Sequence, residues 1–175
     1  SIEKNPVKKE ELTRLLSRFD FSSSDQLLDQ YPPNLRGQHV IWLANNVRLL
    51  LIFDDINDAL DNLDAEVDFW FLDGFSPAQN EAMWLPKNFT KIFFRSRPGA
   101  ELATYSAAGN VRRALEYAGF ETKKRRGFGK KKERLNARKP GEWQPARTTT
   151  DSISVIGSGL AGFFCAEALS RRGVN

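Results

Sequence analysis

The stretch Val67–Pro77 reads VDFWFLDGFSP, and its composition changes sharply halfway along. An almost continuous apolar and aromatic run is followed at once by an acid, a glycine and a proline. A short apolar run that ends in turn residues is typical of an interior strand in a parallel sheet. We therefore expect Asp73 at the carboxyl end of a central strand, where ligands bind in open α/β sheets.

The segments around this strand alternate between strand-like and helix-like patterns. Two apolar runs, 40–43 and 47–53, flank Asn45-Asn46 and predict a β-hairpin, whereas 20–38 has the composition of a loop. Apolar spacing and turn residues predict helices over about 6–19, 56–63, 88–95 and 109–118, and further strands from 100 to 105 and from 120. This order, with right-handed crossovers, predicts a Rossmann-like, doubly wound α/β sheet.

Composition narrows the class of protein. The chain has 175 residues and 41% hydrophobic residues, which is enough for one domain, or for a domain with a piece of another. One cysteine and one histidine argue against an internal disulfide, a Cys/His zinc site and a His-containing catalytic triad, so no metal is expected. A polar beginning and the lack of a long apolar run predict a cytoplasmic protein without signal peptide or membrane span.

Positive charge is concentrated in one segment. Residues 1–122 carry 13 basic and 18 acidic side chains, whereas 123–139 carry 10 basic and one acidic, and 140–175 carry three of each. An acidic body with one basic segment indicates a polyanionic partner that approaches from one side. The alternative is an ordinary solvated charged face.

Two further acids stand where predicted strands meet helices. Glu3 precedes the helix that Asn5-Pro6 is expected to start, and a carboxylate there commonly binds ribose hydroxyls in nucleotide-binding α/β folds. The alternative for Glu3 is an exposed acid favoured by the helix dipole. Asp55 is either the N-cap of the next helix, which the local pattern favours, or a ligand for an adenine amino group.

The end of the chain has a different character. Residues 136–151 contain two prolines and no apolar periodicity, which predicts a linker. A short apolar strand at 153–156 then leads into GSGLAG and an apolar helix, so Gly157, Gly159 and Gly162 match the dinucleotide fingerprint G-x-G-x-x-G. The acid that completes this fingerprint would lie beyond Asn175, so we expect the chain to stop inside a second Rossmann unit.

Four blocks in order resemble one family over nearly the whole chain. They are DFWFLDGFSPAQNEAMW, ATYSAAGNVRRALEYAGF, KKRRGFGKKKERL and VIGSGLAG. The sequence resembles the MnmC family of bifunctional tRNA wobble-uridine modification enzymes. That resemblance implies the later part of an S-adenosylmethionine-dependent methyltransferase domain at 1–135, a linker at 136–151, and the start of an FAD-dependent oxidoreductase domain at 152–175. In the family, the oxidoreductase removes a carboxymethyl group and the methyltransferase completes 5-methylaminomethyl-2-thiouridine.

The resemblance also implies roles for individual residues. Glu3 would bind the ribose of S-adenosylmethionine, Asp55 would lie near the adenine, and Asp73 would face the methyl-transfer centre. Asp54 departs from the pattern, because a glycine is usual there. The family's glycine-rich donor loop would precede Ser1, so this chain alone is expected to bind S-adenosylmethionine poorly and not to retain FAD.

The expected chemistry needs few groups. A sulfonium is a good leaving group, so alignment supplies most of the catalysis, and Asp73 could orient the uncharged amine and accept its proton. Phe75 and Trp84 are candidates to stack on the uracil or the sulfonium, with packing under the loop as the alternative. Phosphates of tRNA would meet the basic side chains, which are Lys123, Lys124, Arg125, Arg126, Lys130, Lys131, Lys132 and Arg134.

Two rival functions follow from the same residues. A non-catalytic RNA-binding α/β module would have the same basic segment, with acids that serve only the fold. A small-molecule methyltransferase fused to an unrelated oxidoreductase would share the strand-end acids but would not need the basic segment at 123–139.

Overall fold

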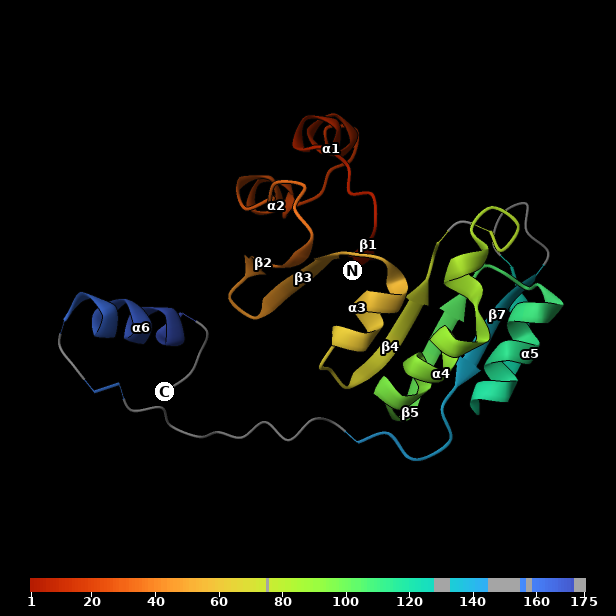
Figure 1. Cartoon of the computed structure of the whole chain (residues 1–175). Helices are drawn as coiled ribbons and strands as arrows, with labels where there is room; N and C mark the ends of the chain where they lie inside the picture. Colours follow the sequence, from red (N-terminus) through yellow and green to blue (C-terminus); the bar gives the residue numbers. More distant parts are fainter. Residues whose placement is uncertain (75, 128–132, 145–154, 157–158, 172–175) are drawn as a thin grey trace. The chain divides into compact units, whose positions relative to one another are not determined.

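The computed structural model describes residues 1–74, 76–127, 133–144, 155–156 and 159–171 (Figure 1). The chain divides into two compact units. The first comprises Ser1–Asp54 with Ala146–Asn175, and the second comprises Asp55–Pro145. Each unit has a sheet of its own.

The first unit contains a three-stranded sheet with the order β1-β3-β2. Its strands are β1 (Ile2–Glu3), β2 (Gly37–Ala44) and β3 (Val47–Phe53). β1 runs parallel to β3, and β2 and β3 form the antiparallel hairpin that Asn45-Asn46 predicts. Ile41, Ile52 and Phe53 are buried and form the core of this sheet.

Two short helices precede the hairpin, α1 (Lys9–Leu16) and α2 (Ser24–Asp29). α1 was expected to start at Pro6 but begins three residues later. The Tyr31 hydroxyl donates to the Val7 carbonyl at 2.9 Å, and the Asn34 amide donates to the Pro6 carbonyl at 3.1 Å. These contacts hold the segment before Lys9 in a non-helical conformation. α2 lies in the stretch that was predicted to be a loop.

The second unit contains a four-stranded sheet with the order β4-β5-β7-β6. The strands are β4 (Val67–Leu72), β5 (Ser96–Thr104), β6 (Glu121–Arg126) and β7 (Glu133–Arg138). β4 and β5 are parallel, and β7 runs antiparallel to both of its neighbours. The prediction of an interior strand in a parallel sheet is therefore wrong within the described residues: β4 pairs with β5 alone and lies at the edge of a mixed sheet.

Helices α3 (Ile56–Asn62), α4 (Pro86–Arg95) and α5 (Gly109–Ala118) cover one face of this sheet, as Figure 1 shows. Buried side chains come from both layers, with Leu60, Phe89 and Leu115 on the helices and Leu102 and Leu135 on the strands. On the other face, Phe69 and Phe71 of β4 are 39% and 78% exposed. Among the described residues, the sheet is thus covered on one side, which differs from the predicted doubly wound arrangement.

A glycine stop and an unpredicted strand complete this unit. Gly119 ends α5 with a φ of +106°, and a Cβ there would lie 3.0 Å from the Phe93 ring, so the predicted glycine stop is confirmed. β7 was not predicted, and its last three residues, 136–138, are the first residues of the segment assigned to a linker. Trp143 in the same segment donates its indole N–H to Asp68 at 2.9 Å.

The last described element is α6 (Leu160–Ser170), with Gly159 as its N-cap residue. This confirms the helix predicted after the glycine fingerprint. Val155 and Ile156 are not in a strand, and the rest of the predicted strand lies outside the described residues. No helix in the described part of the chain is both long enough and apolar enough to cross a bilayer.

Candidate active site

The turn after β4 carries Asp73 and is tied to the end of β5. Asp73 is exposed and directly follows the strand. The hydroxyl of Tyr105, one residue beyond β5, donates a hydrogen bond to the Gly74 carbonyl. A Cβ at Gly74 would overlap the end of the Met83 side chain, so any larger residue would have to displace Met83. The position of Asp73 is therefore set by a fixed neighbour; Phe75 lies outside the described residues.

A cavity of about 860 Å³ opens at this end of the sheet. Its walls come from the turn after β4, the segment between β5 and α5, and the start of β7. The lining residues are Ser76, Pro77, Ala78, Glu81, Tyr105, Ser106, Ala107, Ala108, Asn110 and Glu133. The cavity lies at the carboxyl ends of the two parallel strands, which is where ligands bind in open α/β sheets.

Trp84 is a core residue. It ends the short 3₁₀ helix η1 (Glu81–Trp84), is 6% exposed and packs against Phe89 with ring centroids 6.4 Å apart. Asn88 holds the same turn by donating to the Ala82 carbonyl at 3.0 Å. The structure thus gives Trp84 the packing role that sequence analysis left open as the alternative to stacking on a substrate.

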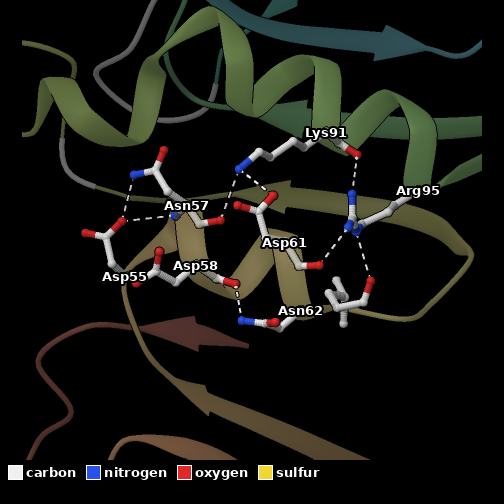
Figure 2. A network of polar contacts seen from close by, with 8 residues as sticks. Asp55, Asn57, Asp58, Asp61, Asn62, Lys91 and Arg95 are labelled. Carbon is white, nitrogen blue, oxygen red and sulfur yellow. Dashed lines mark hydrogen bonds and ion pairs between the residues drawn. The ribbon is translucent and has the colours of Figure 1, made fainter.

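Asp55 caps helix α3 (Figure 2). Its Oδ1 accepts hydrogen bonds from the Asn57 backbone N–H at 3.0 Å and from the Asn57 side-chain amide at 2.7 Å. This is the N-cap role that the sequence favoured. An adenine ligand would have to share a carboxylate that already completes the first turn of the helix.

The other end of α3 is held by α4 (Figure 2). Lys91 forms an ion pair with Asp61 at 2.6 Å, and the Arg95 guanidinium donates to the Leu63 and Asp61 carbonyls at 2.9 and 3.3 Å. Carbonyls at a helix C-terminus lack partners within the helix, so a cation that donates to them stabilises that end. Asp55 therefore stands on a helix that is fixed at both ends.

Glu3 lies in the first unit, at the end of β1. Its Oε1 accepts a hydrogen bond from the Asn5 backbone N–H at 2.8 Å, which fixes the side chain just beyond the strand. Burial and the charge of Glu3 raise the pKa of Tyr31 above its ordinary value, so the two side chains are close enough to interact. Asp54, which replaces the usual glycine, is 14% exposed and pairs with Arg36 at 2.8 Å.

The basic segment forms most of the β6–β7 hairpin. Lys123, Lys124, Arg125 and Arg126 lie on β6, Arg134 lies on β7, and all five are exposed. Arg125 stands directly opposite Arg134, whereas Lys124 pairs with Glu133 at 2.7 Å. Like charges that face each other across two strands are unfavourable unless an anion neutralises them. Lys130, Lys131 and Lys132 lie outside the described residues.

The glycine fingerprint is described only in part. Gly159 caps α6 and Gly162 lies in its first turn, whereas Gly157 lies outside the described residues. Among the described residues, no side chain caps α6, so its first amide groups have no side-chain partner there and could bind an anion. A Cβ at Gly159 would meet no atom of the described chain within 4 Å, so protein packing does not explain that glycine.

Sequence analysis missed two residues of the cavity, Tyr105 and Ser106. Tyr105 was expected only as the last residue of the strand from 100 to 105, and Ser106 only as part of the turn before the next helix. Their position could have identified them, because they follow a strand that is parallel to β4. The carboxyl ends of two neighbouring parallel strands lie at the same edge of a sheet, where ligands bind.

Comparison with known proteins bears on this site. A family described as S-adenosyl-L-methionine-dependent methyltransferase matches residues 21–140. Two relatives are named tRNA 5-methylaminomethyl-2-thiouridine biosynthesis bifunctional protein MnmC. The one from Chromohalobacter salexigens is 43% identical over 99% of this chain and 27% of its own length. The one from Marinobacter nauticus is 41% identical over 99% of this chain and 28% of its own length. The chain thus spans less than a third of these relatives.

A solved structure supports the fold. The crystal structure of MNMC2 from Aquifex aeolicus superposes with a TM-score of 0.50 and 18% sequence identity, over 86% of this chain and 51% of the other. At that identity the likeness concerns the α/β fold alone.

Proposed function

The chain belongs to the family of S-adenosyl-L-methionine-dependent methyltransferases, and from this we propose that it methylates the aminomethyl nitrogen of a wobble uridine in tRNA. The observation that carries the proposal is the exposed Asp73 at the end of β4, in a turn that is held by Tyr105, a residue that lines a cavity of about 860 Å³. The names of the relatives that align with 99% of the chain supply the substrate class.

Glu3 is the residue we assign to the methyl donor. Its carboxylate is exposed and already oriented by the Asn5 N–H, as a group that accepts ribose hydroxyls must be. S-adenosylmethionine, when bound, supplies a methyl group on a sulfonium leaving group. Asp55 is the weaker candidate, because its Oδ1 serves the helix cap.

Asp73 is the group that we assign to the substrate amine. Among the described residues, no hydrogen bond or ion pair engages its carboxylate, although the adjacent Gly74 is held by Tyr105. An aminomethyl group is largely protonated at neutral pH and must lose a proton before or during attack. A fixed, exposed carboxylate can hold the ammonium form and then accept the proton.

The β6–β7 hairpin is the surface that we assign to tRNA phosphates. Its outward face presents Lys123, Arg125 and Arg134, and the repulsion across the Arg125–Arg134 pair would be relieved by a phosphate between them. A non-catalytic RNA-binding module would also use this hairpin. The two hypotheses differ at Asp73, which such a module would not need.

The relatives are named bifunctional proteins, and α6 suggests what a second function could be. We extend the proposal to an FAD-dependent oxidoreductase domain that starts at the glycine fingerprint, with Gly159 and Gly162 close to the pyrophosphate of FAD. The support is the uncapped start of α6 and the open space at Gly159.

The test is methyl transfer from labelled S-adenosylmethionine to tRNA that bears 5-aminomethyl-2-thiouridine. It is run with the 175-residue chain and with a longer polypeptide that contains it. We expect Asp73→Asn to abolish transfer and to leave the Kd for tRNA unchanged. Asp68→Asn, an exposed acid on the same strand, is the control and should leave transfer intact. Near-normal turnover of Asp73→Asn would refute the catalytic assignment and favour the binding module.

A further inference from the structure

Asp73 and Tyr105 leave two neighbouring parallel strands at the same level. In the register of β4 and β5, Leu72 stands opposite Thr104. Asp73 and Tyr105 are the next residues of the two chains, so they start their turns side by side. The Tyr105 hydroxyl donates to the carbonyl of Gly74, the residue that follows Asp73. This hydrogen bond ties the turn after β4 to the end of β5, immediately next to the carboxylate.

Tyr105 stands on a backbone that is itself fixed. Its neighbours Thr104 and Ser106 are 4% and 7% exposed, and the Ser106 N–H donates to the Thr104 hydroxyl at 3.1 Å. Thr104 also pairs with Leu135 of β7, so this end of β5 has a strand on each side. Because its backbone is held in this way, the Tyr105 hydroxyl can hold the Gly74 carbonyl in one place.

The turn after β4 is limited on a second side by Met83. A Cβ at Gly74 would overlap the end of the Met83 side chain, so the turn has little space to move toward η1. Asn88 fixes η1 in turn, because it is fully buried, at 0% exposed, and donates to the Ala82 and Met83 carbonyls at 3.0 and 3.4 Å. Gly74 therefore lies between a hydrogen-bond donor and a packed side chain.

We propose that Tyr105 is a positioning residue for methyl transfer, which acts by holding Asp73 at the position where its carboxylate meets the substrate amine. When the leaving group is already good, alignment supplies most of the rate, and a displacement of about 1 Å can cost about 100-fold. Tyr105 also lines the cavity, so a ligand there would border the residue that holds the turn. This inference rests on the proposed function for the role of Asp73.

The test compares two replacements of Tyr105 in the polypeptide that transfers methyl groups to tRNA. Tyr105→Phe keeps the ring and loses the donor, whereas p-aminophenylalanine at this position keeps an N–H donor at the end of the ring. We expect Tyr105→Phe to lower kcat about tenfold, the rate equivalent of one hydrogen bond. The KM for tRNA should stay unchanged, because the β6–β7 hairpin is assigned to the phosphates. The amino variant should recover most of the parent kcat.

Two control variants separate positioning from a loss of stability. Ser96→Ala removes the hydroxyl that donates to the Ile92 carbonyl at 2.7 Å and accepts from the Trp70 indole at 2.9 Å. Since Ser96 lies at the opposite end of β5, its loss should lower the Tm and leave kcat unchanged at a temperature where the variant is folded. Tyr117→Phe removes the hydroxyl of a tyrosine that is 83% exposed, and it should change neither quantity.

NMR relaxation of the ¹⁵N-labelled, 175-residue chain measures the turn without any reaction. We expect order parameters of about 0.85 for the amides of Asp73 and Gly74 in the parent, and below about 0.6 in Tyr105→Phe. Equal order parameters in the two proteins would overturn the inference, as would a Tyr105→Phe variant with the parent kcat or an amino variant that is no faster than Tyr105→Phe. A parent polypeptide that transfers no methyl group would refute the proposed function instead, and the order parameters would still decide whether Tyr105 holds the turn.

Discussion

Replacing Arg125 and Arg134 together with serine should make tRNA binding weaker and much less sensitive to salt. The two arginines stand directly opposite each other on β6 and β7, and both are exposed. Because they repel each other in the free protein, their removal should change the free energy of unfolding by no more than about 0.5 kcal/mol. A loss of binding can then be assigned to the lost charges.

The number of hairpin cations determines how strongly tRNA binding should depend on salt. Four cations of the described hairpin form no ion pair with described residues, namely Lys123, Arg125, Arg126 and Arg134, whereas Lys124 pairs with Glu133. Four phosphate contacts give a slope of log K against log salt of about −3, or a loss of about 60-fold in affinity between 50 and 200 mM salt. With two contacts the slope is about −1.5 and the loss about eightfold.

The assay is fluorescence anisotropy of labelled tRNA at several KCl concentrations. The control is the double variant Arg112→Ser with Arg113→Ser, which removes the same charge from exposed positions on α5. Its slope should equal that of the parent chain. An unchanged slope for the hairpin variant would refute the phosphate contacts, and an equal drop in both variants would show that only net charge matters.

Two further predictions concern stability. Arg95→Ala removes the donors to the Leu63 and Asp61 carbonyls, and it should lower the free energy of unfolding by about 2–3 kcal/mol. Urea unfolding followed by tryptophan fluorescence measures this loss. A loss below about 0.5 kcal/mol would contradict the stabilising role of these contacts between α3 and α4. Burial and Glu3 raise the pKa of Tyr31 on folding, so this residue stabilises the protein below its ordinary pKa of about 10 and loses that contribution as pH rises through the folded value. Tyr31→Phe should flatten the fall in Tm between pH 9 and 11, and an equally steep fall would contradict this.

Local signals in the sequence predicted the elements that depend on neighbouring residues. β3 spans Val47–Phe53 as its apolar run predicts, and Gly119 ends α5 because only the left-handed conformation allows the turn. The cap role of Asp55 was also visible, since an acid before a helix satisfies the first turn by itself. In each case the cause lies within a few residues of the effect.

The errors arise where distant contacts decide. α1 starts late because Tyr31 and Asn34 bond the carbonyls of the residues before it. β7 has the sequence ERLNAR, in which only Leu135 and Ala137 are buried, so its strand state depends on pairing with β5 and β6. Leu135 and Ala137 do alternate with polar residues, but two apolar residues in six are too weak a signal to predict a strand.

β4 shows a different limit of sequence analysis. Its apolar run correctly predicts a strand, and Trp70 and Leu72 do face the helices. The same run suggested burial on both faces and a neighbour on each side, but Phe71 is 78% exposed and the described strand pairs on one side. An apolar side chain shows that burial is tolerated at its position, but it does not show which helix or strand packs against it.

Three acids, Glu3, Asp55 and Asp73, follow strands and look similar in the sequence, but the structure gives them different surroundings. Asp55 completes a helix cap, a contribution of about 1 kcal/mol that would explain the acid without any ligand. Glu3 is oriented by one backbone N–H and keeps an exposed carboxylate. Asp73 makes no bond with the described chain, yet its turn is fixed by Tyr105. Because Asp73 is exposed and bonds nothing in the described chain, its carboxylate is free to take the substrate amine that we assign to it.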